Sequence, residues 1–186
     1  MPATEFRTRI GGATIELDAY GGDFTSPVDL GVPNEEGVTV IYEADYAELK
    51  DGVSLGLREI EKIAHNFSFE CLLIEHRARN IALSFGFPTA QVTDNSGDDV
   101  PNESFEFSDY QPQTYYRARV RAPQAQDVAL YDVWTGYRMA PMAKFNQAVK
   151  IGGHRFIPVM LKATQDPDNS NKLGGFYSEY DDGDLP

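Results

Sequence analysis

The residues that could carry out catalysis in this chain are few and poorly placed for it. His65 and Cys71 belong to one alternating stretch, but six residues of extended chain separate them by about 20 Å at ~3.3 Å per residue. The other two histidines, His76 and His154, lie outside any catalytic motif, since the sequence has no GxSxG elbow, P-loop or HExxH. We therefore expect no enzymatic activity, no catalytic residue, and a buried, inert thiol at Cys71.

Two acidic stretches resemble calcium-binding loops only superficially. In the stretch 94–105 the sixth position is Asp99, where an EF-hand requires Gly, and the twelfth is Phe105, where it requires Glu. The stretch 166–177 fails at both positions as well. We therefore expect neither a dedicated metal site nor a cofactor.

The composition excludes several classes of partner. Sixteen basic residues against twenty-nine acidic ones give a net charge of −13, which argues against a protein that wraps nucleic acid. No apolar run approaches transmembrane length, and residues 1–10 lack the apolar core of a signal peptide. We expect a soluble protein made in a reducing compartment, without a membrane partner.

The elements that position these residues are mainly strands. Apolar residues alternate in the stretches 13–20, 38–49, 59–73, 114–122, 127–139 and 154–163. One change of period, from Ala78 to Phe85, predicts a single short helix that ends at Gly86. With no repeat and no linker, we expect one domain over residues 1–186, mainly β, with terminal arms at about 1–12 and 165–186.

An acidic set of residues lies on two successive strands. Glu43 and Asp45 share one face of the first strand, and Glu59 and Glu61 begin the second. Like charges side by side destabilise a sheet, so this face must be wet. Two readings are open: a solvated outer face or the lining of a water-filled channel.

A basic set of residues occupies one face of a later strand. Arg117, Arg119 and Arg121 alternate there and need acidic partners, from this chain or from a neighbouring one. In a net-acidic protein, a basic strip facing an acidic strip suits head-to-tail assembly of identical subunits. We therefore place these arginines at a subunit interface.

The connection between the two acidic strands is longer than a tight hairpin requires. Residues 50–58 contain the turn signal Asp51-Gly52 and three apolar residues at alternate positions. We expect a projecting tip with Lys50, Val53, Leu55 and Leu57 in a docking contact. A tip that folds back onto its own domain is the equal alternative.

The order of these parts resembles the tail tube (major tail) proteins of long-tailed bacteriophages. The likeness runs from about Gly11 to Asp166, beginning with GGATIELDAY and a loop that holds PVDLG. VTVIYEADYAELKDG leads to the tip, IEKIAHNFSFECLL passes into the helical IEHRARNIALSFG, and FIPVMLKATQD ends the likeness.

The resemblance implies a β-sandwich with one flanking α-helix, assembled into hexameric rings. Strands of each subunit would join an inter-subunit β-barrel around a lumen, and stacked rings would form the conduit for DNA ejection. The lumen would be lined by Glu43, Asp45, Glu59 and Glu61, and the 50–58 tip would dock on the next ring. Partners would be further copies, other tail proteins and DNA that passes without specific binding, in a virion assembled in the host cytoplasm.

Two alternatives to a tail tube subunit remain open. One is another tail component, such as a terminator or an injection-system tube subunit. The other is a monomeric β-sandwich that binds carbohydrate through Tyr115, Tyr116, Trp134 and Tyr137.

Overall fold

The chain folds mainly into antiparallel strands. The computed structural model describes residues 4–10, 12–50, 57–89, 92–94, 103–104, 113–124, 130–143 and 156–181. Among these residues it has one α-helix, so the predicted mainly β class is confirmed. The elements are β1 (Thr4–Ile10), β2 (Thr14–Ala19), β3 (Val28–Asp29), β4 (Pro33–Lys50), β5 (Leu57–Leu73), α1 (Ala78–Ser84), β6 (Thr93–Asp94), β7 (Glu103–Ser104), β8 (Tyr116–Pro123), β9 (Leu130–Met142), β10 (Ile157–Ala163), a 3-10 turn (Pro167–Asn169) and β11 (Gly174–Asp181).

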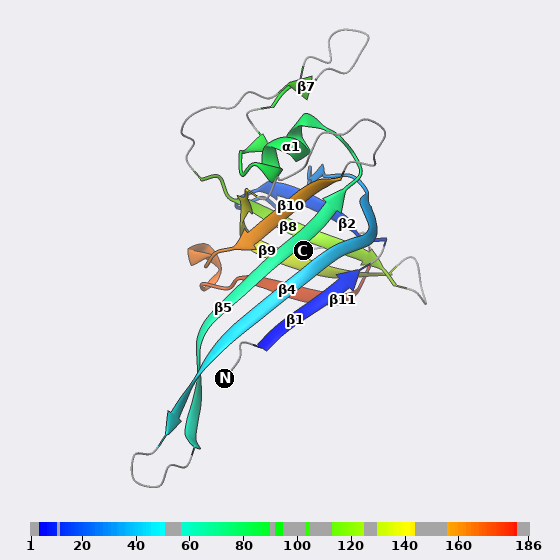
Figure 1. The fold of residues 1–186 in the computed structure, drawn as a ribbon. Coiled ribbons are helices and arrows are strands. Elements are labelled where there is room, and N and C mark those ends of the chain that lie inside the picture. The colour runs from blue at the N-terminus through cyan, green and yellow to red at the C-terminus, as the bar shows by residue number, and fades with distance from the viewer. Residues whose placement is uncertain are drawn as a thin grey trace.

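Nine of the described strands form one continuous sheet. Its order is β1-β4-β5-β10-β9-β8-β2-β3, and β11 pairs with β9 beside β10. In Figure 1, β1, β4, β5 and β10 lie in front, while β2, β8, β9 and β11 cross behind them. We call these the front and back layers. They are joined through β10, which pairs with β5 on one edge and with β9 on the other.

The core lies between the two layers. Alternation along each strand sends every second side chain inward, as the period of a strand requires. Phe69 of β5 and Leu161 of β10 are fully buried from the front, and Ile15 of β2 and Val120 of β8 from the back. Each such side chain contributes about 1.5–3 kcal/mol by leaving water.

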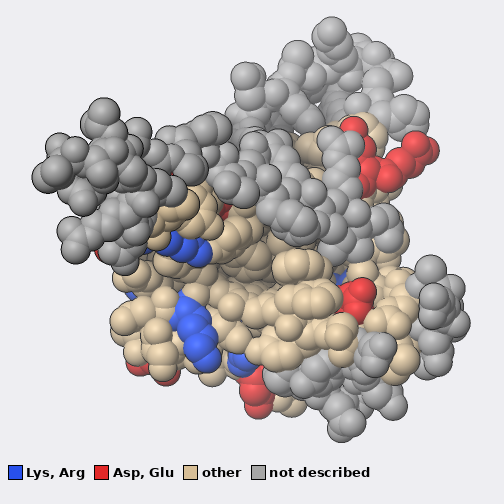
Figure 2. Space-filling model, turned by 90° about the horizontal axis from the view of Figure 1, so that it is seen from below, with Lys and Arg blue, Asp and Glu red and all other residues tan. Residues whose placement is uncertain are grey.

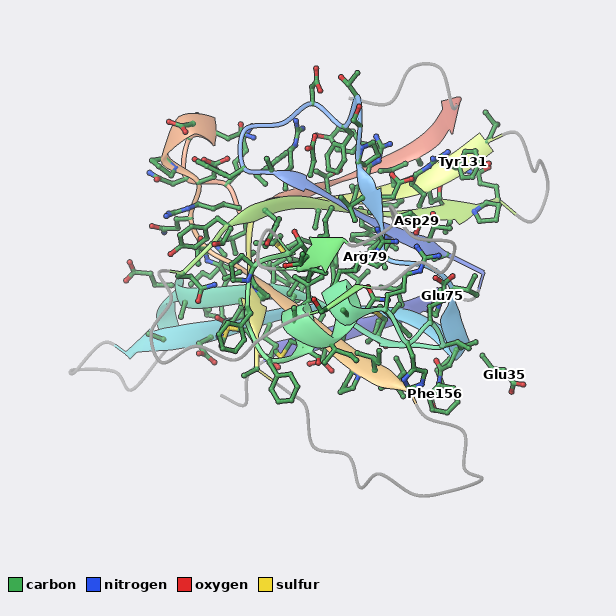
Figure 3. All side chains as sticks on the ribbon, turned by 90° about the horizontal axis from the view of Figure 1, so that it is seen from above. Asp29, Glu35, Glu75, Arg79, Tyr131 and Phe156 are labelled. Carbon is green, nitrogen blue, oxygen red and sulfur yellow. The ribbon has the colours of Figure 1, made fainter. Side chains whose placement is uncertain are left out.

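The short helix α1 closes the upper end of the molecule. It has seven residues, and the chain leaves it at Gly86, whose φ of 81° suits a residue without Cβ. Asn80 is completely buried, and its Nδ2 donates to the carbonyl oxygens of Leu30 at 2.9 Å and Glu75 at 3.1 Å. Figure 3 shows Glu75 and Arg79 at this end of the molecule. The helix is thus held by a buried amide as well as by packing.

Both terminal segments expected to be arms contribute a strand to the sheet. Residues 4–10 form β1, which pairs with β4, and residues 174–181 form β11, which pairs with β9. The side chains of β11 that the structure describes are exposed or half-buried, so this strand lacks the buried apolar alternation that identified the others.

Candidate functional site

A β-bulge divides the long β4–β5 ribbon into two parts. Asp45 pairs with Ala64, but the next residue, Tyr46, pairs with Lys62, so Ile63 has no opposite residue. An extra residue on one strand exchanges the faces of all residues beyond it. The odd-numbered residues of β5 that face the core at Phe67 therefore face the other way in the part before Ile63, at the outer end of the ribbon.

The bulge brings all four predicted lumen residues to one face of the ribbon by register. Glu61 pairs with Ala47, two positions after Asp45, and Glu59 pairs with Leu49, two positions after Ala47. Positions two apart along β4 share a face, so Glu59 and Glu61 stand on the face of Glu43 and Asp45. Without the bulge they would stand on the opposite face.

The opposite face of the ribbon carries a lysine and an exposed isoleucine. Lys62 Nζ lies 4.6 Å from the centre of the Tyr42 ring, which places Lys62 on the inner side of β4. Ile60 is 47% exposed. The bulge therefore separates the basic and apolar residues of this part of β5 from its acidic ones.

The acidic face is exposed to solvent only on the outer part of the ribbon. Asp45 and Glu61 are exposed and Glu43 is half-buried, whereas Ile41, two positions before Glu43, is buried. The side chain of Glu59 lies outside the described residues. Seen from below, the described acidic side chains stand at separate points near the margins and form no single patch (Figure 2). Whether this face lines a lumen stays a prediction.

The predicted docking tip lies at the far end of the ribbon. The β4–β5 ladder ends where Lys50 pairs with Leu57, and Figure 1 shows the ribbon projecting well beyond the rest of the sheet. Val53 and Leu55 lie outside the described residues, as do the side chains of Lys50 and Leu57. The docking role of these four residues stays a prediction.

The three predicted interface arginines have partners within their own chain. Arg119 is buried, and its Nε donates to Glu16 Oε2 at 2.5 Å. Arg121 Nη1 lies 3.3 Å from Glu16 Oε1, and Arg117 Nη1 donates to the Gly22 carbonyl oxygen at 2.9 Å. Glu16 faces these residues because β2 pairs with β8 across more than a hundred residues of sequence.

Aromatic rings complete the surroundings of these arginines. The guanidinium carbon of Arg119 lies 4.4 Å from the Phe24 ring centre, and that of Arg121 lies 4.5 Å from the Tyr131 ring. Cation–π contacts of this kind stabilise a charge that has left water. The carboxylate and the aromatic rings that surround these arginines thus all come from the same chain. The role of the arginines between subunits stays a prediction.

An apolar groove, which the sequence did not indicate, opens between the two layers. It has a volume of about 410 Å³. Trp134 of β9 and Phe176 of β11 form one wall, with ring centres 4.4 Å apart, and Phe176 is 49% exposed. The lining residues are Tyr42, His65, Phe67, Trp134, Lys172, Leu173, Gly174, Gly175 and Phe176.

Close approach of β11 to the front layer depends on a glycine. A Cβ on Gly174 would stand 2.4 Å from the Thr135 carbonyl oxygen and 2.5 Å from Phe67 Cε1. Real Cβ atoms do not approach other heavy atoms so closely, so no larger residue fits there without a shift of the backbone. Gly174 therefore sets the width of the groove at this point.

A tyrosine and two aspartates connect the end of β2 to the turn that precedes β11. The Tyr20 hydroxyl lies 2.7 Å from both Asp166 Oδ1 and Asp168 Oδ2. Hydrogen bonding to these carboxylates raises the pKa of Tyr20 above its ordinary value. Nearby, burial together with a 2.7 Å contact to the Tyr177 hydroxyl raises the pKa of Tyr137 to about 12.

The aromatic residues of the carbohydrate-binding alternative do not gather on one surface. Tyr116 and Tyr137 are both buried, and the Tyr116 hydroxyl accepts a hydrogen bond from the Thr89 backbone nitrogen at 2.8 Å. Tyr115 lies under the guanidinium of Arg138, whose carbon is 3.8 Å from the ring centre. Of the four predicted rings, Trp134 is the one that lines the groove.

The described residues include no cluster suited to a metal ion and no membrane-spanning helix. Within those ranges, no three His, Cys, Asp or Glu side chains come together closely enough to hold a metal. No helix in the described part of the chain is long and apolar enough to cross a bilayer. Cys71 is a free, buried cysteine, and burial raises the pKa of its thiol to about 12.

Comparisons with protein families and with curated proteins identify no relative. No protein-family model matches the chain, and no curated protein matches it. A functional interpretation therefore depends on the surfaces described above.

Proposed function

We propose that this chain is a structural subunit that assembles with identical copies into stacked rings, forming a tube of the kind found in bacteriophage tails. The subunit would be a β-sandwich whose front layer joins those of its neighbours in a closed inter-subunit barrel. The lumen of the tube would serve as a conduit for DNA ejection. In the virion, the tube would also contact other tail proteins.

The observation that carries this proposal is the incomplete front layer. Among the described strands, β1 has a partner on one edge only. On the edge of β5 that faces β10, the part before Ser68 has no partner among those strands. Unpaired edges recruit further strands, and soluble proteins usually cover them. Two different edges of one layer suit a head-to-tail contact that closes into a ring.

The charge of the ribbon supports the same proposal. Asp45 and Glu61 are exposed on the outer face of the front layer, the face turned away from the core. A ring built from front layers would present that face to its bore. Carboxylates there repel phosphate, so DNA would slide without adhering.

Light scattering and negative-stain microscopy of the purified chain test the proposal. We expect tubes of stacked rings with a central bore. A single ring that never stacks would instead favour a terminator-like tail component. A 20.7 kDa monomer at all concentrations would refute assembly and favour a monomeric binding module.

The lumen assignment has a test of its own. The double substitution Glu43→Lys and Asp45→Lys should leave tube formation intact, because both positions face away from the core. It should slow DNA passage, measured as the rate of genome release from particles that carry the variant. Unchanged release would remove these two residues from the lumen while leaving the tube proposal standing.

A further inference from the structure

The apolar groove between the two layers has the size and the construction of a small-molecule site. Its volume of about 410 Å³ falls within the range of roughly 300–1,000 Å³ that is usual for such sites. Its walls belong to paired strands, β4 and β5 on the front side and β9 and β11 on the back. The groove is therefore already formed in the folded subunit, and assembly into a tube makes no use of it.

The two walls of the groove are built from aromatic rings. On the back side the ring centres of Trp134 and Phe176 lie 4.4 Å apart, and the two planes are inclined at 40°. On the front side the rings of Tyr42 and His65 lie 6.4 Å apart and are inclined at 33°. Aromatic groups prefer offset or tilted contacts with ring centres about 4.5–7 Å apart. A planar ring is thus a suitable occupant, because it can contact the walls on both of its faces.

Positive charge borders the groove on both sides. Lys172 lines it from the back layer, and Lys62 stands at its front edge, with Nζ 4.6 Å from the centre of the Tyr42 ring. The bulge at Ile63 is the reason for this arrangement, because it places Lys62 on the inner face of the ribbon and Glu61 on the outer face. The groove therefore has two basic groups at its edges, and the nearby acid of β5 is turned away.

The described lining of the groove contains no acidic side chain to balance these lysines. Asp166 pairs with Lys172 through the backbone, but its carboxylate is buried and accepts a hydrogen bond from the Tyr20 hydroxyl at 2.7 Å. Neither lysine forms a salt bridge with a carboxylate in the described part of the chain. In a protein of net charge −13, such a groove is complementary to an apolar anion.

The same lining distinguishes between classes of ligand. A sugar needs side-chain amides or carboxylates to bind its hydroxyl groups, and none of the described lining residues is Asn, Gln, Asp or Glu. An aliphatic acid would pair with the lysines but would not stack on the rings. An aromatic acid makes both kinds of contact.

We infer that the groove binds a small planar aromatic carboxylate. Its ring lies against Phe176 and Trp134, and its carboxylate faces Lys62 and Lys172. This inference goes beyond the proposed function and does not depend on it, because a subunit can bind such a ligand whether or not it assembles.

Contact quenching of fluorescence tests the inference. Trp134 is the one tryptophan of the chain and stands in the wall of the groove, so its emission reports on this groove directly. The probe is 4-bromobenzoate, whose bromine quenches an indole that it touches. We expect saturable quenching with half-saturation on the order of 0.1–1 mM, as the small size of the probe allows.

Two matched probes separate charge from ring. The compound 4-bromobenzamide keeps the ring without the charge, and 6-bromohexanoate keeps the charge without the ring. Each should need at least about a fivefold higher concentration than 4-bromobenzoate to reach half-saturation, because each loses one of the two contacts. A light-scattering measurement on the same samples records whether the chain is assembled.

Variants of the groove lysines test the charge contact within the protein. Lys62→Gln and Lys172→Gln should each raise the half-saturation concentration of 4-bromobenzoate about threefold and leave that of 4-bromobenzamide within about twofold. Lys162→Gln removes the same charge from the outer face of β10 and should change neither value. Urea unfolding of each variant verifies that the subunit is still folded.

A variant of the exposed ring tests the stacking contact. Phe176 is 49% exposed, so Phe176→Ala should leave the subunit folded. It should raise the half-saturation concentrations of both aromatic probes about tenfold, because the ring that packs on Trp134 is lost.

The outcomes also separate this inference from the proposed function. Quenching that rises in proportion to concentration for all three probes, without saturation, overturns the inference. So does a benzamide that binds as tightly as the benzoate, or a Lys62→Gln and a Lys172→Gln variant that both bind like the Lys162→Gln control. Tubes that form without saturable quenching overturn the inference and leave the proposed function standing. Saturable, charge-dependent quenching in a chain that stays monomeric supports the inference and overturns the proposed function.

Discussion

Replacing Arg119 by methionine tests whether the arginine strip stabilises the subunit itself. The Arg119–Glu16 pair is almost out of water, with side-chain exposures of 8% and 11% and an Nε–Oε2 distance of 2.5 Å. Methionine keeps an unbranched apolar stem but removes the guanidinium and its charge, which leaves Glu16 with Arg121 at 3.3 Å. Removing one member of a buried pair costs about 3–5 kcal/mol. Because Arg121 remains, we expect the lower end, about 3 kcal/mol.

Urea unfolding of the subunit, under conditions where it is monomeric, measures this loss. With a slope of about 1–3 kcal/mol per M, the midpoint should fall by at least about 1 M. Arg121→Met is the matched control, because Arg121 is more exposed and its contact is longer. It should cost about 1 kcal/mol. Raising the salt concentration should hardly change the Arg119 effect, since buried pairs are weakly screened.

A double-mutant cycle with Glu16→Gln separates the pair from its surroundings. The two substitutions together should cost clearly less than the sum of their separate effects. The reasoning is refuted if Arg119→Met changes the unfolding free energy by less than about 0.5 kcal/mol, the size of an ordinary surface substitution. A variant that folds normally and instead loses salt-sensitive association would place Arg119 between subunits.

Three further predictions concern other parts of the fold. Asn80→Ala should lower the unfolding free energy by about 1–3 kcal/mol in urea titrations, because the Leu30 and Glu75 carbonyls lose their buried donor; a cost near zero would contradict the anchoring of α1. Tyr20 has a raised pKa, so its contribution to stability is present below pH ~10 and falls as the pH rises past that value. Tyr20→Phe should therefore lose less stability than the unmodified chain between pH 8 and 10.5, and equal losses would disprove the link. Gly174→Ala should cost about 1–3 kcal/mol and shift the near-ultraviolet signal of the Trp134 wall, whereas Ser178→Ala, at an exposed position, should do neither.

The sequence predicted those strands whose apolar residues alternate against a core. Ile15, Phe69 and Val120 are buried where the alternation places them, and the helix ends at Ser84, two residues before the Gly86 that was predicted as its end. The two strands in the segments expected to be arms were missed; in β11 the described side chains are exposed or half-buried, so no buried apolar period marks that strand. The alternation of apolar residues shows which side of a strand packs against the core, but it does not show which strands lie at the edge of a sheet.

The candidate site was predictable only where it depended on residues close in sequence. The alternation of Glu43 with Asp45 showed that they share a face, but no local signal located the bulge at Ile63 that brings Glu61 to the same face. The arginine strip was recognisable, whereas its partner Glu16 could be found only from the pairing of β2 with β8. The groove likewise depends on the meeting of β5 with β11, far apart in the chain.

The strand pairing implies an order of events during synthesis. β4 and β5 are joined by a short connection and form the longest ladder, so they can pair as soon as both have left the ribosome. β2 must wait for β8, about 100 residues later, which at 5–20 residues per second takes roughly 5–20 s. During that interval Ile15 and Leu17 have no back layer to pack in, so the nascent chain passes through a period in which it is prone to aggregation and suited to capture by chaperones.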